Sequence, residues 1–165
     1  MSTSLMTPGT ARRLTEGERT LAAEVFGAAL STDRIRIFAL PVWRRAFAAG
    51  PGLVCWPAKG ALRDFSRARL GVQAILVHEL THAWQAQTGI NLVLAKLKAG
   101  DGPAAYHYEP AAGRGFRDFN IEQQAMAVQH AFLASRGGPA PHGAETYALL
   151  LSGSPLEAGL KPFKV

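Results

Sequence analysis

Apolar residues recur at helical spacing in two long segments of the chain. In the first, Thr15 and Glu18 have the spacing of a capping box, and the apolar residues that follow predict an amphipathic helix to about Leu30. The second segment, residues 69–88, is apolar on most of its circumference and stops before Gly89. We therefore expect it to be a central helix that is buried on most sides.

Three shorter runs between these helices have the composition of strands. Charged residues and isoleucine alternate over residues 34–38, and two apolar runs cover residues 53–56 and 61–65. The last two runs are separated by residues 57–60, whose proline and glycine are turn signals. We expect a small mixed or antiparallel sheet that packs on the central helix.

Regular elements are harder to place in the last part of the chain. Residues 90–97 can add a turn or two of helix, after which glycine and proline predict a long loop. Asn120 is suited to cap a helix from Ile121 to about Arg136, which two glycines and a proline then stop. Residues 142–151 predict a last helix.

These elements predict an α+β fold. With 165 residues the chain has the usual size of one domain, and its 48% hydrophobic and 18% charged residues suit one ordinary core. We expect a single domain over residues 1–165, with a flexible segment at 1–14 and an irregular tail at 152–165.

Composition excludes several classes of protein. A single cysteine, Cys55, rules out an intramolecular disulfide and a cysteine-rich zinc site. No apolar run approaches the roughly 20 residues that cross a bilayer, so we expect no insertion into a membrane. The first residues lack the pattern of a secretory signal peptide, which predicts a cytoplasmic protein or export by a route that needs no such signal.

The formal net charge of +6 at pH 7 suits an anionic partner such as nucleic acid. The basic residues come as scattered pairs, however, without interleaved aromatics or a known nucleic-acid motif. We interpret them as a solvated surface and rank nucleic-acid binding last among the functional hypotheses.

The candidate chemistry lies in the expected central helix, where His78, Glu79 and His82 form an H-E-x-x-H pattern. Histidines four apart on a helix lie about 40° apart around its axis and one turn apart along it, so both rings can reach one ion. Glu79 is offset by about 100° from His78, so its carboxylate can address a water on that ion from outside the ligand set. The alternative is a pair of hydrogen-bonded core histidines.

A zinc site of this kind needs a third protein ligand. Residue 88 is Thr rather than the histidine of the metzincin pattern, so another helix has to supply that ligand. Glu122 is our first choice because it falls in the first turn of a predicted helix, where the helix dipole favours a carboxylate. Ala125, one turn later, is small enough to let two helices approach. The rival ligands are His107, Glu109, Asp118 and His130.

The order of these motifs resembles a known protein class. His78-Glu79-x-x-His82 followed by Glu122-x-x-Ala125 is similar to gluzincin-type zinc metallopeptidases of minimal size. More narrowly, the chain resembles small bacterial vgr-related proteins, which are named for their association with type VI secretion spikes. The stretches that carry this resemblance are residues 15–38, 75–87, 89–92, 106–108 and 120–132.

The resemblance implies a zincin-like fold with one zinc ion. His78, His82 and Glu122 would be the zinc ligands and Glu79 the general base. In a zincin the strand that precedes the central helix, here residues 61–65, offers an open edge to which an extended peptide can add. The resemblance also suggests a secretion-spike component as a partner.

Three functional hypotheses remain. The first is a zinc-dependent metallopeptidase or amidase, in which Glu79 takes a proton from the attacking water and delivers it to the leaving amine of a peptide substrate. The second is a zincin-shaped structural or adaptor protein of a secretion apparatus, and the third is a basic nucleic-acid-binding domain. Glu79 favours the first, because a structural zinc site has no use for an acid or base beside its ligands.

The loop between the two ligand-bearing helices holds a further candidate. A phenol can donate a hydrogen bond to a transition-state oxyanion without carrying charge. Of the two tyrosines in this loop we choose Tyr108 over Tyr106, because Tyr108 is nearer in sequence to the helix that carries Glu122. The alternative is that both tyrosines pack their rings on the core and expose their hydroxyls.

Overall fold

The computed structural model describes residues 4–110 and 113–160. Within these ranges the chain forms four strands and six α-helices, joined by turns and short 3-10 helices. The strands are β1 (Ala11–Arg13), β2 (Arg36–Leu40), β3 (Phe47–Gly50) and β4 (Leu53–Pro57). The helices are α1 (Glu16–Phe26), α2 (Leu70–Gln87), α3 (Leu92–Ala99), α4 (Pro103–Tyr106), α5 (Ile121–Ser135) and α6 (Ala144–Leu151). The predicted α+β class is confirmed.

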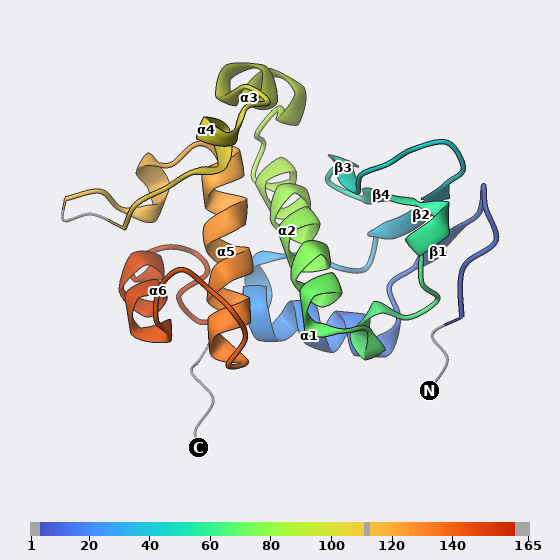
Figure 1. Ribbon diagram of the computed structural model, residues 1–165, viewed down its shortest axis with the longest axis horizontal. Helices are drawn as coiled ribbons and strands as arrows, with labels where there is room; N and C mark the ends of the chain where they lie inside the picture. Colours follow the sequence, from blue (N-terminus) through green and yellow to red (C-terminus); the bar gives the residue numbers. More distant parts are fainter. Residues whose placement is uncertain (1–3, 111–112, 161–165) are drawn as a thin grey trace.

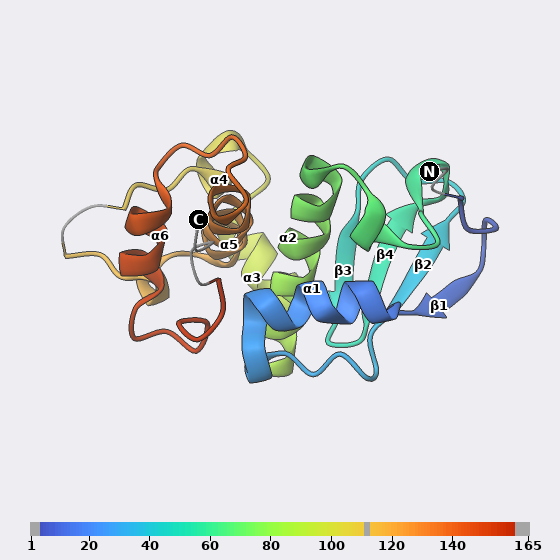
Figure 2. The ribbon, with the colours of Figure 1, turned by 90° about the horizontal axis from the view of Figure 1, so that it is seen from below.

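The elements lie side by side in the order sheet, α2, α5 and α6, and α1 crosses one end of this stack (Figures 1 and 2). α2 is in the middle, packed against α5 on one side and against β3 on the other. Every residue from Leu76 to Gln85 is consequently buried, which explains why apolar residues surround most of this helix. The predicted central helix is confirmed.

The sheet is small and mixed, with the strand order β1-β2-β4-β3. β2 and β4 run parallel, whereas β1 pairs antiparallel with β2, and β3 pairs antiparallel with β4. β3 is therefore an edge strand, and it is the strand beside α2 (Figure 2). Its register shifts between Ala48 and Gly50, which marks a β-bulge.

The strand predicted at residues 61–65 is wrong. Leu62 makes only an isolated bridge to Leu5, and the chain then enters a 3-10 helix that begins at Phe65. Asp64 caps this helix, because its carboxylate accepts a hydrogen bond from the backbone N–H two residues later. Ala61 and Phe65, at the ends of the run, are fully buried without pairing as a strand, so the short apolar run alone could not identify its conformation. The open sheet edge near the central helix belongs to β3.

The N-terminal segment, predicted to be flexible, instead contributes β1 to the sheet. Next to this strand pair, the Arg12 guanidinium contacts both carboxylate oxygens of Glu18, at 2.7 and 2.6 Å. Glu18 is fully buried and also accepts hydrogen bonds from the backbone N–H groups of Thr15 and Phe65. The predicted capping box of α1 is confirmed, and its glutamate also ties β1 to the turn before α2. The expected flexibility of residues 1–3 falls outside the described residues.

The C-terminal helices begin and end close to the predicted positions. The Asn120 side chain caps α5 by accepting a hydrogen bond from the backbone N–H of Gln123 at 2.9 Å. The long loop predicted before α5 contains regular structure, namely the end of α3 and all of α4. Residues 152–160 form turns, and the prediction for residues 161–165 falls outside the described residues. In the described ranges no helix has both the length and the apolar character to cross a bilayer.

Candidate metal centre

α2 presents two histidines on the face that meets α5. His78 and His82 are one turn apart, and their ring centroids are separated by 4.9 Å. Both side chains are buried, because this part of α2 is enclosed by neighbouring elements. The spacing of four residues therefore places two imidazoles side by side, as the sequence predicts.

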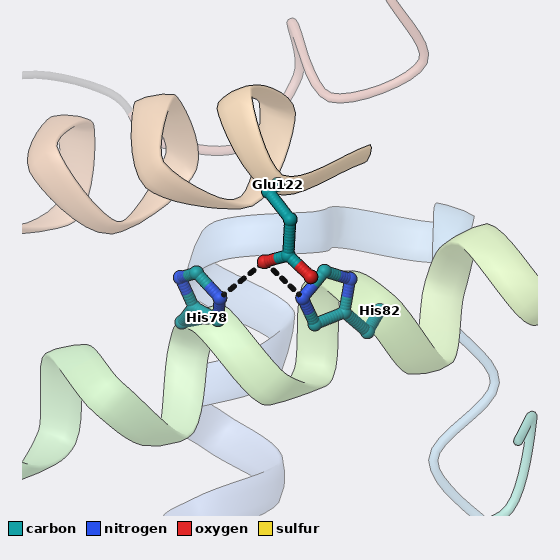
Figure 3. Close-up of side chains that lie close together, drawn as sticks. All are labelled: His78, His82 and Glu122. Carbon is teal, nitrogen blue, oxygen red and sulfur yellow. Dashed lines mark hydrogen bonds and ion pairs between the residues drawn. The ribbon is translucent and has the colours of Figure 1, made fainter. Parts of the chain in front are cut away.

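α5 brings Glu122 to the same place (Figure 3). The carboxylate Oε2 of Glu122 lies 3.1 Å from Nε2 of His82 and 3.4 Å from Nε2 of His78. The cap at Asn120 starts α5 two residues before Glu122, so the carboxylate leaves the first helical turn. Ala125 is fully buried and small, which lets the two helices approach.

The three side chains have the geometry of a metal site. Their ligand atoms all lie within 4.8 Å of one another. Two ligands that are each about 2.0–2.1 Å from a tetrahedral zinc ion are about 3.3 Å apart. The nitrogen–oxygen distances of 3.1 and 3.4 Å lie on either side of this value. The cluster could hold a metal ion, and the described ranges contain no second group of this kind.

Gln85 orients one of these histidines. Its side-chain NH2 group donates hydrogen bonds to the carbonyl oxygen of Ile121 at 3.0 Å and to the side-chain oxygen of Gln124 at 2.9 Å. The amide oxygen must then face His82, whose Nδ1 donates to it at 2.8 Å. This bond leaves Nε2 of His82 without its own proton in the neutral ring, and Nε2 is the atom that faces Glu122.

A cation or a proton is needed between His82 and Glu122. The lone pair of Nε2 and an anionic carboxylate oxygen repel each other at 3.1 Å unless a positive charge lies between them. A metal ion supplies that charge for both histidines at once, whereas a proton serves one pair of atoms. The donor set of two imidazoles and a carboxylate therefore fits a divalent metal.

The surroundings of Glu122 keep its carboxylate ionised. Burial alone would raise the pKa of this carboxyl, but its contacts with the His78 and His82 rings and the charge of Lys96 hold the pKa well below its usual range. Lys96 Nζ lies 3.6 Å from Oε1, the carboxylate oxygen that does not contact the histidines. Oε2 is consequently the oxygen that remains for a metal ion.

Glu79 lies beside the cluster without joining it. Its residue surface is only 6% exposed, and its Oε2 has no hydrogen-bond partner among the described residues. Burial raises the pKa of Glu79, while the charges of His78 and Lys96 act in the opposite direction. A buried carboxylate with an unused oxygen and a raised pKa is suited to accept and return a proton.

His78 and Glu79 open into a cavity of about 500 Å³, which we call the metal cavity. Its walls come from α2, from the end of β4, from the segment before β3, and from α4 and α5. The lining residues are Arg44, Arg45, Ala46, Trp56, Pro57, Ile75, His78, Glu79, Tyr106 and Gln129. Glu79 is thus within reach of a molecule that enters the cavity.

The structure does not bring Tyr108 to the metal cavity. The Tyr108 hydroxyl lies 2.7 Å from Nδ1 of His130 and donates to the hydroxyl of Tyr147 at 3.2 Å. Burial and the bond to Tyr147 raise the pKa of Tyr108 far above its usual value. Tyr106, at the end of α4, lines the cavity instead. Tyr106 ends α4 and faces the cavity, whereas Tyr108, two residues after α4, packs against the core.

The rival ligands lie elsewhere. His130 contacts Tyr108, and the His107 side chain is 72% exposed and faces Glu109 at 3.4 Å. The Asp118 carboxylate accepts a hydrogen bond from the backbone N–H three residues earlier. None of these side chains belongs to the cluster of His78, His82 and Glu122.

Sequence reasoning missed the contribution of Gln85. A glutamine three residues after the second histidine, in an otherwise apolar helix, was a signal that could have been read. Its partners at Ile121 and Gln124 belong to another helix, however, and only the folded chain shows them.

Comparison with known proteins places this site in context. The type VI secretion system spike protein VgrG2b of Pseudomonas aeruginosa is 34% identical over 134 residues, which cover 74% of this chain. The match covers only 13% of that spike protein, so this chain spans a small part of the relative's length. No protein-family model matches the chain.

A solved structure extends the likeness to the fold. The effector domain of Pseudomonas aeruginosa VgrG2b superposes with a TM-score of 0.68 at 28% sequence identity. The match covers 87% of this chain and 83% of the solved chain. By sequence and by structure together, the chain is homologous to the effector domain of the VgrG2b spike protein.

Proposed function

We propose that the chain is a zinc-dependent metallopeptidase or amidase with a single zincin-like domain. Glu79 is the observation that carries this proposal. It is buried beside His78, keeps one carboxylate oxygen without a partner, and lines the metal cavity. A centre that served only to stabilise the fold would need the three ligands but no acid or base beside them.

Zinc is the metal that we propose for the cluster of His78, His82 and Glu122. Two neutral imidazoles with one carboxylate form a ligand set that zinc takes in hydrolytic enzymes. When bound there, zinc would polarise a substrate carbonyl and lower the pKa of a water molecule. Gln85 would hold His82 in the tautomer that a metal requires.

The remaining steps belong to side chains of the metal cavity. Glu79 takes the proton of the attacking water and delivers it to the leaving amine, so that an amide bond breaks without a free strong base. The Tyr106 hydroxyl, which replaces Tyr108 in this role, donates a hydrogen bond to the oxyanion that forms at the former carbonyl. Tyr106 lines the same cavity as Glu79, which supports this role.

An extended peptide is the substrate that we propose. β3 is an edge strand beside α2, and on its outer side it pairs with no other strand of the described residues, which is where a peptide strand can add. The backbone of Ala48 in β3 hydrogen-bonds Glu79, so this edge runs directly past the general base. A peptide that pairs with β3 would therefore bring its carbonyl groups to the cavity.

Association with a secretion spike is a second part of the proposal. The relative is named as a type VI secretion system spike protein, and the solved domain is named as an effector domain. We propose that this chain acts as an effector that is exported with a spike. Under the adaptor hypothesis the chain also associates with a secretion spike, but it hydrolyses no substrate. The nucleic-acid hypothesis stays a prediction from the net charge.

The Glu79→Gln substitution tests the proposed activity. The variant should keep one zinc ion per chain, because Glu79 is not a ligand, and it should lose hydrolysis of peptides. Metal analysis and a broad screen of peptides and cell-wall fragments would measure the two properties. Glu145→Gln, which changes an exposed glutamate in α6, is the matched control and should retain both. Zinc-loaded wild-type protein that cleaves nothing but binds a spike component would support the adaptor hypothesis instead.

A further inference from the structure

A second hollow adjoins the metal cavity. It has a volume of about 790 Å³ and is lined by residues 41–45, between β2 and β3, and by residues 57–59 after β4. We call it the basic groove. Arg44, Arg45 and Pro57 line both the basic groove and the metal cavity, so the two hollows are adjacent.

The basic groove carries positive charge that no carboxylate of the described residues pairs with. Arg44, Arg45 and Lys59 are exposed, and residues 41–45 and 57–59 include no acidic side chain. Within the described ranges none of the three forms an ion pair. Some cations elsewhere on the molecule contact carboxylates, as in the pairs Arg12–Glu18, Arg19–Asp33, Arg67–Asp64 and Arg136–Glu24. The three cations of the basic groove differ in that they gather at one hollow.

One wall of the basic groove is apolar and is attached to the edge strand. Trp43 is 56% exposed, and its ring packs edge-on against Phe47, the first residue of β3, with centroids 5.7 Å apart. Val42 beside it is 88% exposed. A peptide that pairs with β3 would therefore run toward a surface that offers an aromatic ring together with guanidinium groups.

We propose that the basic groove is a substrate subsite that selects peptides carrying a carboxylate close to the bond that is cleaved. This inference rests on the proposed peptidase function. Guanidinium groups bind carboxylates through charge-assisted, often bidentate hydrogen bonds, and unpaired arginines next to a reaction site favour such a partner. The carboxylate can come from an acidic side chain or from the C-terminal end of the peptide.

Binding to an inactive protein separates this proposal from the proposed activity. The probes are fluorescein-labelled degenerate peptides with one central position fixed as Glu or as Gln, each made with a free or an amidated C-terminus. Their dissociation constants are measured on zinc-loaded Glu79→Gln protein by fluorescence anisotropy. We expect peptides with the carboxylate to bind at least about tenfold more tightly than their neutral counterparts. A difference between the Glu and Gln peptides identifies a side chain as the source of the carboxylate. A difference between free and amidated peptides identifies the C-terminus.

Substitution of the groove's basic residues tests whether they cause the preference for peptides that carry a carboxylate. Arg44→Gln combined with Arg45→Gln should reduce the ratio of the two dissociation constants to about one, and Lys59→Gln should reduce it in part. Arg36→Gln combined with Arg117→Gln removes the same charge from exposed positions outside the groove and should leave the ratio intact. Circular dichroism and zinc content identify any variant that fails to fold.

Two outcomes overturn the proposal, namely equal affinity for the charged and neutral peptides, or a preference that survives loss of both arginines. Wild-type cleavage of the same peptides reports on the proposed activity separately. Equal cleavage of Glu and Gln peptides keeps the peptidase and rejects the subsite. Selective binding of acidic peptides without any cleavage keeps the basic groove as an anionic-peptide site and rejects the peptidase.

Discussion

His82 and Gln85 lie one turn apart on α2, and the ring Nδ1 of His82 donates a hydrogen bond to the Gln85 side chain at 2.8 Å. The same amide group donates to the backbone of Ile121 on α5. The orientation of one ligand is thereby tied to the helix that carries another, Glu122. The hydrogen bonds of Gln85, which is not itself a ligand, therefore hold the ligands in position relative to one another.

Gln85→Ala should weaken zinc binding by about 10–100-fold, because His82 loses the acceptor that fixes its tautomer and ring angle. Competition with a chromophoric chelator would measure the dissociation constant. Gln87→Ala is the matched control, because Gln87 ends the same helix and, among the described residues, its side chain bonds to Ser31 and Pro51 rather than to a metal ligand. If the two variants bind zinc equally well, Gln85 does not orient the ligand.

Glu122→Ala should abolish stoichiometric zinc binding at neutral pH, because it removes the ligand supplied by α5. Dialysis followed by metal analysis would show the loss, and circular dichroism would show whether the fold persists. Glu109→Ala, which removes an exposed carboxylate, should keep the metal. Full zinc content with unchanged affinity in Glu122→Ala would mean that another residue is the third ligand.

Tyr106→Phe and Tyr108→Phe should have different effects. Loss of the Tyr106 hydroxyl should lower kcat by about 100-fold or more with zinc content unchanged, because it removes a donor to the oxyanion. Loss of the Tyr108 hydroxyl should leave kcat nearly intact and lower the free energy of unfolding by about 1–3 kcal/mol, because half-buried His130 and buried Tyr147 lose a hydrogen bond. Steady-state kinetics and urea unfolding would measure both effects. The reverse result would return the catalytic role to Tyr108.

Asp64 should make the fold sensitive to acid. Partial burial raises the pKa of Asp64, but hydrogen bonds from Ser66 and Thr15 outweigh it and hold the pKa below the usual value. The stabilisation is therefore present above the pKa of the unfolded chain, about 3.9, and is lost as the pH falls through the lower folded value. Urea unfolding of wild type and Asp64→Asn between about pH 5 and 2.5 would show a smaller loss of stability in the variant. Identical slopes would show that Asp64 is not linked to folding.

The long helices could be predicted because their signals are local. α2 is recognised by its apolar circumference, and α5 by the cap at Asn120. β1 and β3 have three and four residues, too few to show a period of two, and their pairing with β2 and β4 depends on distant segments. The run at 61–65 shows the reverse error, since a short run that was read as a strand leads into a 3-10 helix that packs on α1.

The residues of the candidate site also differ in whether a local signal in the sequence could predict their positions. His78, Glu79 and His82 are neighbours on one helix, so their spacing alone predicts their geometry. Glu122 could be proposed because a helix start is a local signal, and the folded chain places it beside the histidines. The choice between Tyr106 and Tyr108 depends on how α4 lies on α5, and the basic groove depends on how two loops meet. Neither relationship can be predicted from the residues next to it in the sequence.

The bond network of Glu18 sets a practical limit on where the chain can be cut. Trimming residues 4–14 as if they were a dispensable leader would strip Arg12 from a fully buried carboxylate and leave that charge uncompensated. It would also uncover the outer hydrogen-bonding edge of β2, which can then recruit a strand from another molecule. A shortened version is therefore expected to aggregate during expression, and a fusion partner is better joined ahead of β1 than in place of it.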